Sequence, residues 1–431
     1  MRIELPEKVE YIIETLQSAG YEAYAVGGCV RDCMLHREPK DWDVTTSADP
    51  YEVKALFRRT VDTGIKHGTV TVMFGENGYE VTTYRLDGEY EDARHPKEVT
   101  FTKSLREDLK RRDFTINAMA YNHKDGLVDL FGGEKDLERR IIRCVGIPGE
   151  RFDEDALRIL RALRFSAQLG FVIEEETETA IKARSTHLNK ISAERIRDEL
   201  NKLLLSVSPE RLIAVNDCGI ADVVLPETVA FLRLGQPAFV VLQGLRDYAG
   251  QGYDTHTELI LCWATLLNAA LLQTGVKDAK KRGFVVKRIL QRLKFDNDTI
   301  SKAASLTEYS TQVPEADLCV IRKQMHRMGE EVFDLWLMFA SGIRFPDMRQ
   351  GFADTTEQIR QMVKEMRSAP YCVSLKQLAV SGSDLIAAGR KPGVALGETL
   401  EFLLEQVLEH PEWNNREKLL AIAEQMNCPD R

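Results

Sequence analysis

Two aspartates separated by one residue, in Asp41-Trp42-Asp43, follow a glycine pair, Gly27-Gly28, at a short distance along the chain. If these aspartates lie on one strand, their side chains point to the same face, roughly 7 Å apart at the backbone. Paired carboxylates suit hard divalent cations, which prefer oxygen ligands. The glycine turn leads into a short predicted helix at 29–35, whose first N–H groups can face a polyphosphate. Either feature alone is compatible with a plain surface turn, but in this order they indicate a small α/β domain for nucleotidyl transfer.

The spacing of apolar residues predicts mixed strands and helices first, and helices thereafter. The expected elements of the first part are a helix at 6–19, strands at 22–26 and 41–46, and a hairpin formed by 68–74 and 79–84. The hairpin is expected because Gly75-Glu76-Asn77-Gly78 separates two β-like runs. From residue 153 onward strand signals are scarce, and a helix is predicted at 153–169.

The length of 431 residues exceeds what one hydrophobic core usually serves, so roughly two to four subdomains are expected. A composition of 44% apolar and 29% charged residues is typical of a soluble globular protein. The net charge of −9 argues against an indiscriminate coat for nucleic acid. This net charge does not exclude a local row of basic residues, such as Arg158, Arg161 and Arg164, which recur every three positions on the predicted helix.

Several features bear on where the protein resides. The eight cysteines are scattered, without the spacing of a disulfide framework or a zinc site. The first residues do not resemble a signal peptide, and the most apolar run, 259–272, is too short to span a bilayer. We therefore expect a cytoplasmic protein without a membrane partner, and the sequence leaves its oligomeric state open.

Five stretches of the first half carry a family resemblance. They are GGCVRD (27–32) with DWD (41–43), RRDFTINAMA (111–120), DLFGG (129–133), EDALRILRALRF (154–165) and SAERIRDEL (192–200). In this order they resemble the motifs of the class II tRNA nucleotidyltransferase and bacterial poly(A) polymerase family. The second half is more weakly similar, so the resemblance depends on the first half.

The resemblance implies an α+β fold, with an N-terminal polymerase-β-like nucleotidyltransferase head of mixed sheet and helices, followed by an all-α neck, body and tail. We expect a catalytic head at 1–141 and a neck for base recognition at 142–207. A helical body, degenerate and HD-like, is expected at 208–315, and a helical tail that binds tRNA at 316–431.

The expected chemistry joins a nucleotide to a 3′ hydroxyl, for which two Mg²⁺ ions roughly 3.5–4 Å apart orient the reacting groups. Asp41 and Asp43 are the candidate catalytic residues and metal ligands. Glu80 is a candidate third metal ligand, with a solvent-facing strand glutamate as the alternative. Gly27, Gly28 and Arg31 are candidates for holding the triphosphate, with Asp32 orienting Arg31.

The second and fourth motifs supply further candidates for nucleotide binding. By resemblance, Arg112 and Asp113 lie near the phosphates and the ribose, within a polar cluster that includes Asn117. Arg161 and Arg164 are candidates for contact with triphosphate or RNA.

Asp155 and Arg158 are one helical turn apart in the predicted helix and would share a face. A carboxylate accepts from an exocyclic amine and a guanidinium donates to a ring nitrogen or carbonyl. One such pair therefore suits both cytosine and adenine, which carry an amino group on the pairing edge. An ordinary surface salt bridge between the two residues is the alternative.

The activity implied by the resemblance is template-independent addition of CCA to tRNA 3′ ends from CTP and ATP, with release of pyrophosphate. Its expected partners are the tRNA 3′ end, CTP and ATP. The polar segment 87–96 resembles the flexible loop of enzymes that add the full CCA, which argues against a CC-adding relative. An A-adding enzyme and a poly(A) polymerase stay open as alternatives, as does a non-catalytic RNA-binding protein on the same fold.

A second metal activity is not expected in the body. Some relatives carry an HD-type phosphohydrolase domain there, but this chain has Leu267-Asn268 where a His-Asp pair would bind metal. His256 is then left without evident ligand partners.

Overall fold

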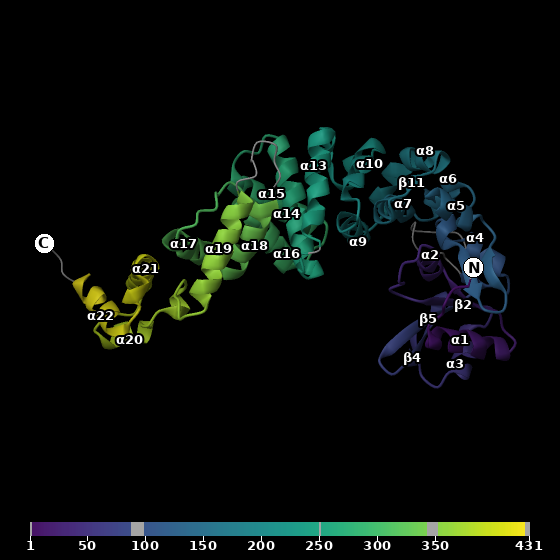
Figure 1. Cartoon of the computed structure of the whole chain (residues 1–431), viewed down its shortest axis with the longest axis horizontal. Helices are drawn as coiled ribbons and strands as arrows, with labels where there is room; N and C mark the ends of the chain where they lie inside the picture. Colours follow the sequence, from purple (N-terminus) through teal and green to yellow (C-terminus); the bar gives the residue numbers. More distant parts are fainter. Residues whose placement is uncertain (1, 88–98, 250, 343–351, 427–431) are drawn as a thin grey trace. The chain divides into compact units, whose positions relative to one another are not determined.

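The computed structural model describes residues 2–87, 99–249, 251–342 and 352–426 (Figure 1). The chain forms two compact units, Met1–Gly235 and Gln236–Arg431. The first contains the sheet and the helices that follow it, and the regular secondary structure of the described residues of the second is helical. The expected α+β architecture, a mixed-sheet head followed by helices, is confirmed. The finer division at 141, 207 and 315 stays a prediction.

A seven-stranded sheet forms the centre of the first unit, in the order β3-β4-β5-β2-β1-β8-β9. Its strands are β1 (Ala23–Val26), β2 (Asp43–Thr46), β3 (Thr60–Gly64), β4 (Thr69–Phe74), β5 (Asn77–Thr83), β8 (Met119–Asn122) and β9 (Gly126–Asp129). The β2–β5 pair is parallel and the other pairs are antiparallel, so the sheet is mixed. A separate antiparallel pair joins β6 (Arg85–Asp87) to β7 (Val99–Phe101).

The predicted local elements of this region are confirmed. Helix α1 (Glu7–Ser18) buries the apolar side that its spacing predicts, including Val9 and Leu16, and contacts β1, β2 and α3 (Pro50–Leu56). Strands β4 and β5 form the predicted hairpin. The short helix after the glycine turn is α2 (Gly28–Met34), and α4 (Leu105–Lys110) follows β7 along the chain.

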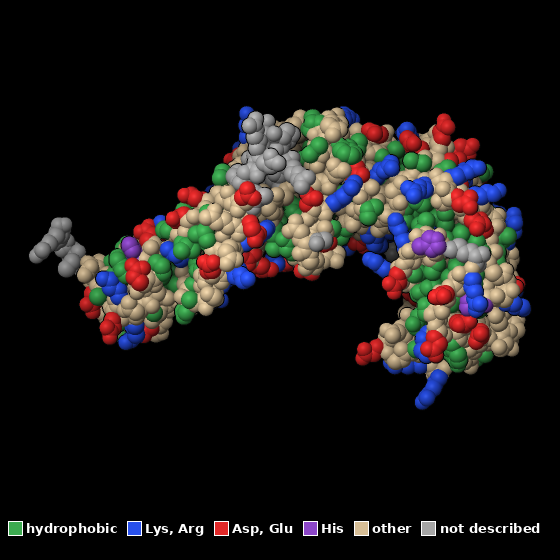
Figure 2. Space-filling model, in the orientation of Figure 1, with side chains coloured by type: hydrophobic (Ala, Val, Ile, Leu, Met, Phe, Trp, Pro, Cys, Tyr) green, Lys and Arg blue, Asp and Glu red, His purple; other side chains and the backbone are tan. Residues whose placement is uncertain are grey.

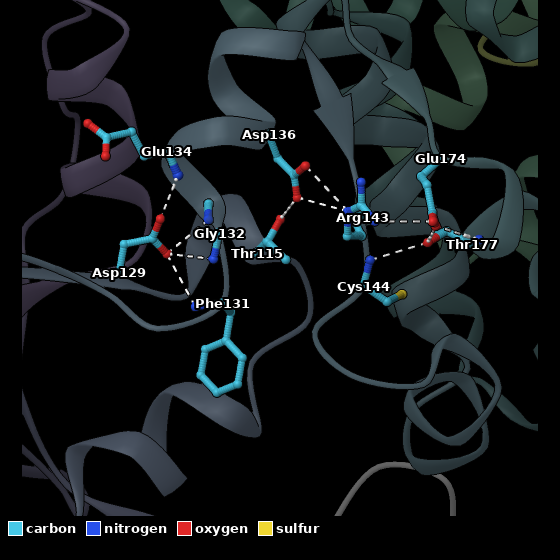
Figure 3. A network of polar contacts seen from close by, with 11 residues as sticks. Thr115, Asp129, Phe131, Gly132, Glu134, Asp136, Arg143, Cys144, Glu174 and Thr177 are labelled. Carbon is cyan, nitrogen blue, oxygen red and sulfur yellow. Dashed lines mark hydrogen bonds and ion pairs between the residues drawn. The ribbon is translucent and has the colours of Figure 1, made fainter.

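Asp129, the first residue of the DLFGG stretch, ends β9 and caps the next helix, α5 (Gly133–Arg139) (Figure 3). Its carboxylate accepts the backbone N–H groups of 131–134 at 2.9–3.3 Å, which would otherwise lack partners at the helix start. A Cβ on Gly133 would lie 2.4 Å from the carbonyl oxygen of Thr115, so only glycine fits here. This stretch therefore has a structural role.

A polar network links α5 to the helices that follow (Figure 3). Arg143 donates to Asp136 at 3.1 Å and to Glu174 at 3.4 Å, and Asp136 also accepts from the Thr115 hydroxyl at 2.6 Å. Beside it, β10 (Ile141–Ile142) pairs in parallel with β11 (Val172–Ile173). This small sheet was not expected in the neck, and it ties the predicted head and neck into one unit.

The helix predicted at 153–169 is wrong in one respect, because it is two helices. Helix α6 (Pro148–Glu154) ends at Asp155, which has extended backbone, and α7 (Leu157–Leu169) begins two residues later. The Asp155 carboxylate accepts the N–H of Leu157 at 3.0 Å. Asp155 therefore lies at the junction of the two helices, not one turn before Arg158 on the same helix. The remaining helices of this unit are α8 (Glu175–Arg184), α9 (Ala193–Leu204), α10 (Leu212–Asp217), α11 (Ala221–Val224) and α12 (Val229–Leu232).

The second unit packs around α14 (Thr255–Gln273), whose residues from Ile260 to Leu271 are all buried. Its other helices are α13 (Gln236–Gly244), α15 (Ala279–Arg292), α16 (Asn297–Glu308), α17 (Leu318–Met328), α18 (Glu330–Gly342), α19 (Phe352–Arg367), α20 (Gly382–Ala387), α21 (Val394–Glu409) and α22 (Arg416–Gln425). The 259–272 run belongs to this longer helix, so the expectation that it is too short for a bilayer is wrong. By length and composition α14 could cross one, but 67% of its most apolar stretch is buried inside the protein, as in the core helix of a soluble domain.

Candidate active site

Three carboxylates meet at the start of β2. Asp43 is the first residue of β2 and pairs in register with Glu80 of the parallel neighbour β5. Asp41 lies two residues before Asp43, just outside the strand, so the expectation that both lie on it is wrong. Desolvation raises the pKa of Asp43, with a further contribution from Asp41, although Arg112 opposes it. Desolvation also raises the pKa of Glu80, and the charges of Asp43 and Asp41 add to this. A cation bound here would relieve that repulsion.

The glycine turn is required by its backbone conformation. Gly27 has φ +82°, a left-handed backbone conformation, and precedes α2. A Cβ at this position would lie 2.9 Å from Nη1 of Arg112. On α2, the Arg31 guanidinium donates to Asp32 at 2.9 Å and to the Asn117 amide oxygen at 2.7 Å. Asp32 therefore does hold Arg31, as expected, and the N-terminal end of α2 is kept close to the second motif.

Asp113 is buried and its carboxylate has several donors. It accepts from the N–H of Phe114 at 2.8 Å, from the Asn117 amide at 3.1 Å and from Nε of Arg161 at 2.7 Å. Burial opposes ionisation, but Arg161 and Asn117 outweigh it and hold the pKa of Asp113 well below its usual range. Asp113 is thus charged at neutral pH and connects the second motif to α7.

Asp108 of α4 was not anticipated and organises two arginines. It is fully buried and pairs with Arg111 at 2.8 Å and with Arg112 at 3.5 Å. The Thr45 hydroxyl of β2 donates to the same carboxylate at 3.1 Å. Burial acts to raise the pKa of Asp108, but the two arginines lower it below its usual value. These contacts place both guanidinium groups beside β2. The signal in the sequence is an aspartate that lies three residues before Arg111 and four residues before Arg112.

Asp155 and Arg158 have separate ionic partners. Asp155 pairs with Arg195 of α9 at 2.7 Å. Arg158 pairs with Glu154 and donates to the carbonyl oxygen of Arg111 at 3.0 Å. Each of the two residues therefore has an ionic partner of its own, and Arg158 is buried rather than on the surface. Arg195 belongs to the fifth motif and Asp155 to the fourth. The resemblance identifies both motifs, but the sequence does not predict this contact between them.

Phe165 gathers three arginines around one ring. The guanidinium carbons of Arg164, Arg31 and Arg161 lie 4.1, 5.1 and 5.4 Å from its centroid. Burial lowers the pKa of Arg164 to about 10, and the nearby Arg161 and Arg31 contribute, although Glu199 opposes them. Crowding of this kind favours a polyanionic ligand, which would neutralise the guanidinium groups.

These residues line a hollow of about 730 Å³ in the first unit. Its lining contains Gly27, Gly28, Arg31, Lys40, Asp41, Asp43, Arg111, Arg112, Asp113, Asn117, Asp155, Leu157, Arg158, Arg161, Arg164, Phe165, Gln168, Arg195 and Lys202. It therefore brings together every predicted nucleotide-binding residue and both catalytic aspartates. Glu80 lies instead in an adjoining hollow that shares the two aspartates. Elsewhere, on the face seen in Figure 2, basic side chains are scattered among acidic ones.

His256, in the second unit, has neighbours that could not be expected from the sequence. Nε2 of His256 lies 3.8 Å from Asp298 and 3.9 Å from Asp296, and 3.0 Å from the Thr299 hydroxyl. His256 and both aspartates are exposed, and Asp296 already caps α16. Asn268, in place of an HD-type aspartate, accepts from the buried Arg282 at 3.0 Å. Asn268 is therefore part of the packing of the helical body. The loop expected at 87–96 is a separate matter: it lies outside the described residues, except for the backbone of Asp87.

Comparison with known proteins agrees with this geometry. Residues 23–143 match the poly A polymerase head domain, 170–232 the probable RNA and SrmB-binding site of polymerase A, and 259–423 a tRNA nucleotidyltransferase domain 2. The CCA-adding enzyme of Levilactobacillus brevis is 38% identical over 98% of this chain and 99% of its own. That of Lactiplantibacillus plantarum is 37% identical over 96% and 94%.

Solved structures give the same result. The crystal structure of the Bacillus stearothermophilus CCA-adding enzyme in complex with CTP has a TM-score of 0.81 at 32% identity, covering 98% of both chains. The Thermotoga maritima CCA-adding enzyme complexed with tRNA shares the fold, with a TM-score of 0.63 at 20% identity, over 99% of this chain and 100% of its own. The protein therefore belongs to the CCA-adding enzymes, a family of bacterial-type tRNA nucleotidyltransferases.

Proposed function

We propose that this protein adds CCA to the 3′ ends of tRNA without a template, using CTP and ATP. The observation that carries this proposal is the single hollow in which the aspartate pair faces a cluster of arginines. The arginines suit a nucleoside triphosphate and the aspartates suit the cation that accompanies it. The relatives named above are CCA-adding enzymes, and they match this chain over nearly their whole length, which supports the same conclusion.

In this reaction the 3′ oxygen of the tRNA forms a bond to the α-phosphorus of the incoming nucleotide. The bond from this phosphorus to the bridging oxygen breaks, and pyrophosphate leaves with the bonding electrons. The hydroxyl proton passes to a neighbouring carboxylate or to water. Arg31, Arg161 and Arg164 would hold the phosphate charge before and after this step.

The acidic cluster fits a divalent metal, and we propose Mg²⁺ held by Asp41, Asp43 and Glu80. The raised pKa values of Asp43 and Glu80 support this assignment, because they reflect partly desolvated carboxylates that repel one another. When bound, such ions stabilise the attacking and leaving oxygens. The exposed group around His256 belongs to the second unit and has no part in this proposal.

Base choice is assigned to Asp155 and Arg158. Arg195 and the N–H of Leu157 fix the orientation of the Asp155 carboxylate and leave it further acceptor capacity. The carboxylate would accept from the amino group of C or A, and Arg158 would donate to the neighbouring ring atom. Uracil and guanine present a carbonyl in place of the amino group and would be rejected.

The rival functions have less support. A non-catalytic RNA-binding protein has no use for carboxylates that repel the phosphate backbone, and the similar proteins reported above are all CCA-adding enzymes. We place the protein in the cytoplasm, and its free described cysteines support a reducing compartment.

The decisive experiment is to incubate the protein with tRNA that lacks its CCA end and to supply CTP, ATP, or both. Sequencing of the products should show CC with CTP alone and CCA with both nucleotides. Addition of A alone, of long A tracts, or of nothing would each overturn the proposal. Asp41→Ala protein in the same reaction controls for contaminating activity.

A further inference from the structure

A second hollow, of about 720 Å³, borders the same aspartate pair. Residues 40–43 form one side of it, and residues 76–80, from the turn of the β4–β5 hairpin and the first half of β5, form the other. Lys40, Asp41 and Asp43 also line the arginine-rich hollow, so the aspartates stand between two cavities of similar size.

The two hollows differ in chemistry. The first presents several arginines, as a triphosphate requires. Among the described residues that line the second, Lys40 is the one basic side chain, and Trp42, Tyr79 and Asn77 supply two aromatic rings and an amide. The other side chains that line it are the carboxylates of Asp41, Asp43, Glu76 and Glu80. Such a surface is poorly suited to a triphosphate, but it suits a nucleobase, because aromatic rings stack on bases and amides pair with their edges.

The geometry of phosphoryl transfer assigns a direction to each hollow. The attacking and leaving oxygens lie roughly in line on opposite sides of the phosphorus. If the pyrophosphate is held among the arginines, the attacking hydroxyl arrives from the side of the carboxylates that faces away from them. The second hollow shares the aspartates with the first but is otherwise lined by Trp42 and the hairpin, so it offers an acceptor a place beside the carboxylates that the arginines do not line.

The hairpin side of this hollow is held firmly. The ring of Tyr79 packs edge-on against Phe74 at 5.9 Å, and Phe74 packs in the same way against Tyr11 of α1 at 5.8 Å. A Cβ on Gly78 would lie 2.6 Å from Cγ2 of Thr71, so the two strands approach closely here. Trp42 and Tyr79 are both half-buried, which leaves part of each ring accessible.

We propose that this second hollow holds the 3′-terminal nucleotide of the tRNA that is being extended, with Trp42 and Tyr79 in contact with its base. The inference rests on the proposed function and names the acceptor side of its site. Trp42 is a positioning residue for the acceptor, and it keeps the 3′ hydroxyl beside Asp41 and Asp43. Because stacking tolerates any base, one surface can serve successive acceptors that end in different nucleotides.

The test is a comparison of Trp42→Ala and Trp42→Phe with the parent protein on tRNA ending in CC. Trp42→Ala should raise KM for tRNA about ten-fold or more, because stacking on an aromatic ring contributes that much per base. The KM for ATP and kcat at saturating tRNA should change less than about three-fold. Trp42→Phe keeps an aromatic ring and should restore most of the affinity for tRNA.

The matched control is Tyr51→Ala, which removes an aromatic ring that is 72% exposed on α3 of the same unit. It should leave every constant unchanged. Asn77→Ala is a second probe of the hollow that removes no ring, and it should also raise KM for tRNA. It replaces Trp42→Ala as the test if that variant does not fold.

A direct readout accompanies the kinetics. A tRNA whose terminal base is a photoreactive thio-base should crosslink to Trp42 or to residues 76–80 of the parent protein. Crosslinks confined to α7 or α9, or a Trp42→Ala protein with raised KM for ATP and unchanged KM for tRNA, would overturn the inference. A parent protein that adds no nucleotide to this tRNA would instead overturn the proposed function itself.

Discussion

Arg195 of α9 donates to the Asp155 carboxylate at 2.7 Å, across 40 positions of the chain. The residue proposed to read the base is therefore held by a helix of the following motif. This contact assigns a physical task to the fifth motif, which is to orient a carboxylate at a break between two helices.

Removing this contact should loosen base choice. Arg195→Ala leaves Asp155 free to rotate, so we expect UTP and GTP to be used about ten-fold better relative to CTP and ATP, since a charge-assisted hydrogen bond is lost. Asp155→Ala should act in the same direction and more strongly. Competitive incorporation of all four nucleotides measures this. Arg197→Ala, on the same helix and beside the exposed Asp198, is the control, and equal selectivity in all variants would contradict the assignment.

Asp43→Asn should abolish activity while stabilising the metal-free protein. A direct metal ligand is lost, so kcat should fall by more than about 100-fold. The folded-state pKa of Asp43 is raised, so its ionisation in the native state opposes folding at pH values above that pKa. The variant should therefore melt at a higher temperature than the parent at pH 7, and this difference should vanish in acid, where both forms are neutral.

The same variant tests metal binding without an activity assay. Mg²⁺ should raise the melting temperature of the parent protein, because a ligand that binds only the folded state stabilises it. The rise should be much smaller in Asp43→Asn. An equal rise in both proteins would mean that the metal binds elsewhere, for which His256→Ala provides the comparison.

Phe165→Leu should weaken binding of the triphosphate without changing base choice. The ring organises Arg31, Arg161 and Arg164, and each cation–π contact contributes about 0.5–2 kcal/mol. We expect Kd for CTP and ATP to rise together by about ten-fold or more in equilibrium binding. Phe152→Leu, which shortens a fully buried ring of α6, controls for the loss of packing. A change confined to one nucleotide would contradict a role in holding the phosphates.

Asp129→Ala should destabilise the first unit without acting on the reaction. Four backbone N–H groups lose their acceptor, and we expect a loss of about 2 kcal/mol in the free energy of unfolding. Asp129→Asn keeps Oδ1, which accepts three of the four, and should retain most of the stability. Chemical denaturation measures both. Loss of activity in protein that is fully folded would show that this aspartate does more than cap α5.

Local chemistry in the sequence determined much of this protein. The glycine turn before α2, the β4–β5 hairpin and the apolar side of α1 depend on neighbouring residues, and each formed as predicted. The aspartate pair and the arginines of the second and fourth motifs were recognised by residue type and order, and the fold brings them into one hollow.

Only the tertiary structure decided how these residues are held and what lies beside them. The break at Asp155 separates two helices where the residue pattern indicates one, because the carboxylate bonds to Leu157 and to the distant Arg195. Phe165 collects arginines from α2 and α7. Contacts of this kind join residues far apart in the chain, and no local pattern specifies them. The second hollow likewise exists only because β2 and β5 pair in register and place Glu80 opposite Asp43.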